Sequence, residues 1–127
     1  MSDQPRTSDV VALRPFVPAK YFEISMSFYK DLGFTAIPLS DSLASMHLGP
    51  FAFLLQKFDA DGFACNFMMH MLVNDVEGWW RHIESLELAA KYDVQPPSSP
   101  APQPWGLIVS YVFDPSGVLW HVAQNSG

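Results

Sequence analysis

The stretch Leu107–Gln124 reads LIVSYVFDPSGVLWHVAQ, two apolar runs separated by the tetrapeptide Asp114-Pro115-Ser116-Gly117. Asp at the first position of a turn accepts a local hydrogen bond, Pro at the second presets φ, and Gly at the fourth tolerates the exit geometry. This turn chemistry predicts a β-hairpin in which the two runs pair as antiparallel strands. The hairpin closes the chain, so the preceding elements are organised around it.

The register of this hairpin follows if the pairing is symmetric about the turn. The pairs predicted in this way are Phe113 with Val118 and Tyr111 with Trp120 on one face, and Val112 with Leu119 and Ser110 with His121 on the other. The first face is wholly apolar, whereas the second mixes apolar residues with a hydroxyl and an imidazole. Such a difference is typical of a sheet with helices on one side and a pocket on the other.

Length and composition predict a single domain over residues 1–127, because the chain is 49% apolar but too short for two conventional domains. Seven basic and thirteen acidic residues give a net charge of −6, which disfavours nucleic acid and anionic membranes and favours cationic or neutral ligands. The only cysteine, Cys65, cannot form an internal disulfide. We find no apolar run of signal-peptide or membrane-spanning length, and we expect a cytoplasmic protein.

The order of predicted elements repeats once along the chain. Residues 10–17 form a predicted strand, residues 20–32 a helix that ends at Gly33, and residues 34–39, 43–48 and 51–58 three short strands. After a break at residues 59–62, a strand over residues 65–73 and a helix with Asp75 as N-cap begin the order again. A proline-rich stretch, residues 94–105, supplies at most a short edge strand before the hairpin. We therefore predict two modules, residues 9–58 and 64–124.

Several motifs resemble those of the vicinal oxygen chelate superfamily, which includes glyoxalase I, fosfomycin- and bleomycin-resistance proteins and extradiol dioxygenases. They are Phe28-Tyr29 with Leu32-Gly33-Phe34, Val73-Asn74-Asp75-Val76, and the ending Trp105-Gly106, Asp114-Pro115-Ser116-Gly117 and Trp120. The resemblance extends over residues 10–124. It implies an α+β fold of two βαβββ modules that form a curved mixed sheet around a cleft, usually in a homodimer.

The resemblance also implies four metal-ligand positions, which fall at Arg14, Gln56, Met68 and His121. Of these residues only His121 binds a divalent metal well, because Arg offers no acceptor and Met and Gln are poor ligands for such ions. We therefore expect a degenerate metal site and no cofactor. The alternative is a divalent metal held by a rebuilt site at His70 and His121, with His47 as a further donor.

The residues that we expect to line a ligand pocket come from both modules. They are Arg14, Phe16, Gln56, Met68, His70, Trp105, Ser110 and His121. The guanidinium of Arg14 needs an acceptor, which is either an internal carboxylate or a ligand. Trp105 either lines the cleft or packs inside the protein. A group of methionines, Met46, Met68, Met69 and Met71, forms either an adaptable binding wall or ordinary core.

Three functions are compatible with these features. The first is metal-free binding of a small molecule, cationic or aromatic, by a homodimer similar to the bleomycin-resistance proteins. The second is a metal-dependent lyase or dioxygenase with the rebuilt site at His70 and His121. The third is a protein that keeps the fold for dimerisation or partner contact alone. The sequence leaves open whether the protein catalyses a reaction.

Overall fold

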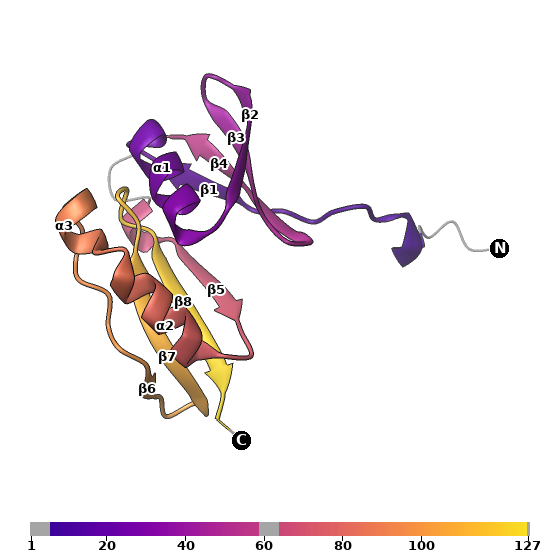
Figure 1. Cartoon of the computed structure of the whole chain (residues 1–127). Helices are drawn as coiled ribbons and strands as arrows, with labels where there is room; N and C mark the ends of the chain where they lie inside the picture. Colours follow the sequence, from indigo (N-terminus) through magenta and orange to yellow (C-terminus); the bar gives the residue numbers. More distant parts are fainter. Residues whose placement is uncertain (1–5, 59–63, 127) are drawn as a thin grey trace.

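The computed structural model describes residues 6–58 and 64–126, and its strands form two four-stranded mixed sheets (Figure 1). The first sheet has the order β1-β4-β3-β2, with strands β1 (Phe16–Ala19), β2 (Thr35–Ser40), β3 (Leu43–Leu48) and β4 (Phe51–Lys57). The second has the order β5-β8-β7-β6, with strands β5 (Met68–Leu72), β6 (Ala101–Pro102), β7 (Leu107–Phe113) and β8 (Leu119–Asn125). In each sheet one pair of strands is parallel, β1 with β4 in the first and β5 with β8 in the second. The other neighbouring strands pair antiparallel. The predicted α+β fold of two βαβββ units is confirmed.

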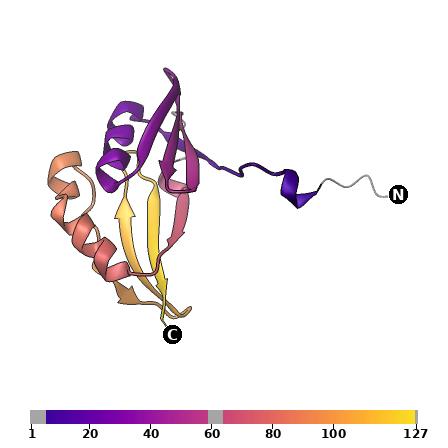
Figure 2. The same ribbon diagram turned by 45° about the vertical axis from the view of Figure 1, so that its right-hand side comes forward.

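The α-helices lie on one side of the two sheets and leave the other side open (Figures 1 and 2). The helices are α1 (Phe22–Leu32), α2 (Val76–Ser85) and α3 (Leu88–Tyr92), with short 3-10 turns at η1 (Thr7–Asp9) and η2 (Ala64–Asn66). Gly33 ends α1 with φ +130°, and the Asp75 side chain accepts a hydrogen bond from the Gly78 amide at the start of α2, as predicted. In the described part of the chain, no helix has the length and apolarity needed to cross a membrane.

The first predicted strand is displaced towards the C-terminus in the structure. Strand β1 begins at Phe16, and residues 10–15 form an extended segment that points away from the body (Figures 1 and 2). Val11 and Leu13 in this segment are 98% and 92% exposed. The apolar pattern predicted a strand over residues 10–17, but no strand in the described part of the chain pairs with residues 10–14. The predicted break at residues 59–62 lies outside the described residues.

The register of the closing hairpin differs by one residue from the symmetric prediction. The observed pairs are Phe113 with Leu119, Val112 with Trp120, Tyr111 with His121 and Ser110 with Val122. The loop between the paired strands contains five residues, 114–118, rather than four, and the Asp114 carboxylate accepts hydrogen bonds from the amides of Ser116 and Val118 within it. A slip of one residue exchanges the faces of one strand relative to the other. Tyr111, not Ser110, therefore shares a face with His121.

The core of the molecule joins the two sheets around Tyr29 of α1. Its fully buried ring packs against Phe53 of the first sheet and Trp120 of the second, with centroid distances of 5.0 and 5.6 Å. Aromatic rings in such tilted and edge-to-face arrangements contribute beyond the area that they bury. Helix α1 is therefore the element that holds the two modules together.

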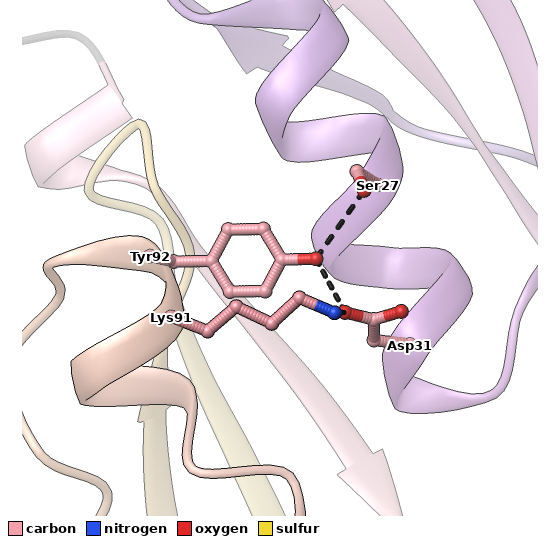
Figure 3. Close-up of polar contacts among 4 residues, drawn as sticks. All are labelled: Ser27, Asp31, Lys91 and Tyr92. Atoms are coloured by element: carbon pink, nitrogen blue, oxygen red, sulfur yellow. Dashed lines mark hydrogen bonds and ion pairs between the residues drawn. The ribbon is translucent and has the colours of Figure 1, made fainter.

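Polar contacts between the helices reinforce this junction at its surface. The Tyr92 hydroxyl of α3 donates to Asp31 and accepts from the Ser27 hydroxyl of α1, and Lys91 forms an ion pair with Asp31 (Figure 3). At the end of α1, His82 Nε2 of α2 lies 2.8 Å from the carbonyl oxygen of Leu32. The two contacts attach different parts of the second module to the same helix.

Candidate functional site

Two histidines and a tyrosine form a row across the open face of the second sheet. His70 of β5 pairs with His121 of β8, which in turn pairs with Tyr111 of β7. The ring centroids of His70 and His121 are 6.2 Å apart, and those of His121 and Tyr111 are 4.9 Å apart. The alternation of side chains along each strand directs all three rings to the side away from the helices.

The imidazole of His121 is held in its neutral form by this environment. Partial burial lowers the pKa of His121 below its usual value of 6.5, and the neighbouring His70 lowers it further. A neutral imidazole donates one hydrogen bond and accepts another. His121 therefore presents an uncharged ring with polar edges near neutral pH.

A pocket of about 360 Å³ wraps around one edge of β5 and includes His70. It is lined by Phe34, Leu48, Phe51, Ala52, Phe53, Met69, His70, Met71, Leu72 and Trp120. Met69 and Met71 enter from the helix side, while His70 and Leu72 enter from the open side. Strand β5 pairs only with β8 in the described sheet, so its other edge faces this pocket. A volume of this size, with apolar walls and few polar groups, is typical of a small-molecule site.

The peptide groups along that edge of β5 alternate between the sheet and the pocket. Phe67 O accepts from Leu119 N, and Val73 N donates to Ala123 O, so the odd-numbered residues bond to β8. In a parallel ladder the intervening residues direct their amide and carbonyl groups the other way. Met68, His70 and Leu72 therefore offer main-chain hydrogen-bonding groups at the rim of the pocket.

The first sheet has a separate, smaller hollow on its open face. Phe16, Pro18, Gln56 and Phe58 line about 110 Å³ there. Phe16 pairs with Leu54, and Pro18 with Gln56. The structure thus brings the predicted residues Phe16 and Gln56 together, but in a hollow distinct from the one that contains His70.

Three other predicted pocket residues lie elsewhere. Ser110 is fully buried on the helix side and donates a 2.6 Å hydrogen bond to the carbonyl of Ser98, so its predicted place beside His121 is wrong. Trp105 is 58% exposed in the turn before β7. Arg14 is exposed in the extended segment before β1, so the expectation of a guanidinium within a strand is also wrong.

The four positions predicted to hold the family's metal are divided between the two sheets and the segment before β1. Met68 pairs with Leu119, whereas His121 pairs with His70. Gln56 pairs with Pro18, and Arg14 lies before the strand. Over residues 6–58 and 64–126, no three His, Cys, Asp or Glu side chains are close enough together to hold a metal ion. The rebuilt site therefore has two imidazole donors, and His47 is bonded instead to Ser45 on the other sheet.

Sequence reasoning missed most of the pocket, including its aromatic walls. Phe51 and Phe53 follow the Gly49-Pro50 turn, and their spacing of two indicated a shared face but not which element would lie opposite. The methionine group gave a partial signal. Met69 and Met71 line the pocket, Met46 is buried in the core, and Met68 is 63% exposed.

The chain belongs to the glyoxalase/bleomycin resistance protein/dioxygenase superfamily, whose family model matches residues 13–122. No curated protein sequence matches the chain. Similarity to solved structures is extensive in fold and low in sequence.

Two of these structures are of proteins that bind bleomycin or confer resistance to it, and a third is of a lactoylglutathione lyase. A bleomycin-binding protein complexed with bleomycin has a TM-score of 0.77 and 22% identity, over 90% of this chain and 98% of that one. A bleomycin resistance determinant encoded on transposon Tn5 has a TM-score of 0.76 and 21% identity, over 91% and 98%. A lactoylglutathione lyase from Agrobacterium tumefaciens has a TM-score of 0.68 and 20% identity, over 94% and 95%. At these identities the likeness establishes a shared fold.

Proposed function

We propose that this protein binds a small organic molecule reversibly and without a metal ion, as bleomycin-binding proteins sequester their ligand. The observation that carries the proposal is the pocket of about 360 Å³ at the edge of β5, in which aromatic and methionine side chains surround one imidazole, that of His70. Apolar walls supply affinity, and a single well-placed polar group orients the ligand. The row of His121 and Tyr111 beside His70 extends this surface.

The small number of metal-binding side chains at the site, the imidazoles of His70 and His121, favours ligand binding over metal-dependent catalysis. His70 and His121 face each other across two parallel strands, which is the observation that supports a metal-dependent enzyme as the second candidate. Catalytic zinc sites, however, use three protein ligands. In the described part of the chain, no third donor joins the two imidazoles. The second candidate would therefore require a ligand from outside that part.

We also propose that the protein is a homodimer. Large apolar side chains are exposed on the extended N-terminal segment and on the open face of the first sheet. The residues concerned, with their exposed fractions, are Val11 (98%), Leu13 (92%), Phe16 (52%) and Ile37 (48%). Exposed apolar surface of this extent is typical of an interaction site. A second copy of the chain would cover the surface symmetrically.

The binding proposal is tested with three probes that share a naphthalene ring: 2-naphthylmethanol, 2-naphthylmethylammonium and 2-naphthoate. At about a hundred times its dissociation constant, a bound probe should stabilise the protein by about 2.7 kcal/mol in thermal unfolding. Ala52→Phe, which fills the pocket, should abolish the effect, and Ala90→Phe on the exposed surface of α3 serves as the matched control. The proposal is wrong if no probe stabilises the protein, or if the two variants respond alike.

A further inference from the structure

The walls of the β5 pocket are built mainly from aromatic and other apolar side chains. Four of its lining residues are aromatic, Phe34, Phe51, Phe53 and Trp120, and two are methionines. Flat rings and thioether sulfurs pack favourably against the face and edge of another aromatic ring. No Asp, Glu, Lys or Arg is among the lining residues that the structure describes.

The acidic residues in the part of the chain that the structure describes are on other elements. Glu23 and Asp31 are on α1, and Glu77 and Glu84 are on α2, which lie on the helix side of the sheets (Figure 2). Asp114 is buried and bonded to Tyr29, so its carboxylate is not available to a ligand. Among the described residues, no carboxylate therefore creates a cation site at this pocket.

Strand register gives the same result for the open face beside the pocket. Side chains on this face include Met68, His70 and Leu72 of β5, Leu119, His121 and Ala123 of β8, and Val109, Tyr111 and Phe113 of β7. None of these residues is a carboxylate or carries a fixed positive charge. A charged ligand on this surface would lose its hydration without gaining an ionic partner, which is unfavourable.

From this distribution we propose that the ligand is an uncharged, flat aromatic molecule with one hydroxyl or carbonyl group that hydrogen-bonds to His70. This inference rests on the proposed binding function and names the class of molecule that the site takes. The aromatic part lies between the phenylalanine rings and the methionines. The polar group meets the imidazole at the edge of β5, where the free main-chain groups of the strand provide further hydrogen bonds.

The three naphthalene probes separate this inference from the binding proposal, because they differ chiefly in charge at pH 7.5. Titration followed by the quenching of tryptophan fluorescence measures affinity close to Trp120, which lines the pocket. The uncharged 2-naphthylmethanol should bind at least about tenfold more tightly than the ammonium or the carboxylate. If a charged probe binds as tightly as the alcohol, the ligand class is wrong while the binding function stands. If no probe binds, the binding function itself fails.

The role of His70 is tested with His70→Leu and a fourth probe, 2-methylnaphthalene, which lacks the hydroxyl. The variant should bind 2-naphthylmethanol about tenfold more weakly, the loss of roughly one hydrogen bond, and should bind 2-methylnaphthalene as the parent does. His82→Leu on α2, on the helix side of the sheets, is the matched control and should change neither affinity. An equal loss for both probes, or no loss for either, would overturn the assignment of His70 as the polar anchor.

Discussion

Tyr29 and Asp114 are joined by a hydrogen bond of 2.5 Å between the phenolic hydroxyl and the buried carboxylate, although 85 residues separate them in the chain. The same hydroxyl accepts a hydrogen bond of 2.8 Å from Trp120 Nε1. Asp114 also accepts from the amides of Ser116 and Val118, so it sets the hairpin loop and attaches that loop to α1. A single carboxylate thus links the local turn to the junction of the two modules.

Tyr29→Phe should destabilise the protein by about 1 to 3 kcal/mol, because it removes the hydrogen-bond partner of the buried Asp114 Oδ2 and of the Trp120 indole. Urea unfolding monitored by tryptophan fluorescence measures the effect. Tyr21→Phe removes the same atom from a half-exposed ring and should have little influence. Equal unfolding midpoints for Tyr29→Phe and the parent would show that this bond contributes nothing.

The carboxyl of Asp114 should make the free energy of unfolding decrease as the pH rises, whereas a carboxyl with a lowered pKa has the opposite effect. Burial raises its pKa from 3.8 to about 6, against the opposing effect of its hydrogen bonds with Tyr29 and the loop amides. Because the folded protein holds this proton more tightly than the unfolded chain, the contribution to stability is complete below pH 3.8 and is lost as the pH rises through about 6. The difference in pKa corresponds to about 3 kcal/mol.

Comparison with Asp114→Asn isolates this contribution from the other titrating groups. Asp31, for example, has a lowered pKa because of its hydrogen bonds with Lys91 and Tyr92, and it acts in the opposite direction. The free energy of unfolding of the parent minus that of the variant should fall between pH 4 and 7. A difference that is constant over this range would refute the raised pKa.

Leu13→Asp should convert the proposed homodimer into monomers, since a charge would enter an apolar interface at a side chain that is 92% exposed in the single chain. Light scattering coupled to size-exclusion chromatography gives the mass of each species. Glu84→Arg, on the exposed side of α2, should leave the parent's mass unchanged. A monomeric parent protein would rule the dimer out.

Metal analysis of the purified protein should find no divalent ion at a stoichiometric level, because His70 and His121 supply only two donors. His121→Ala should therefore have the same metal content as the parent. One ion per chain in the parent, lost in the variant, would favour the metal-dependent enzyme over the binding protein.

Sequence and structure contributed different parts of the candidate site. The alternative of a rebuilt metal site, which came from the family resemblance, named His70 and His121 together, and the sequence located the methionine group. The sequence did not indicate that Phe51 and Phe53 would face β5, because the position of β4 relative to β5 depends on how the two modules pack. Tyr111 was missed because one additional loop residue changed the face that it shares with His121.

The sequence by itself determined the order of elements and therefore the fold class, because helix periodicity, the Gly33 and Asp75 caps and the turn at Asp114 act over a few residues. Tertiary structure decided the hairpin register, the burial of Ser110, the exposure of Arg14 and the pocket at the edge of β5. These depend on contacts between residues far apart in the chain, such as Tyr29 with Asp114 and His70 with His121. Local spacing restricts which face a side chain takes, but only packing determines what lies against that face.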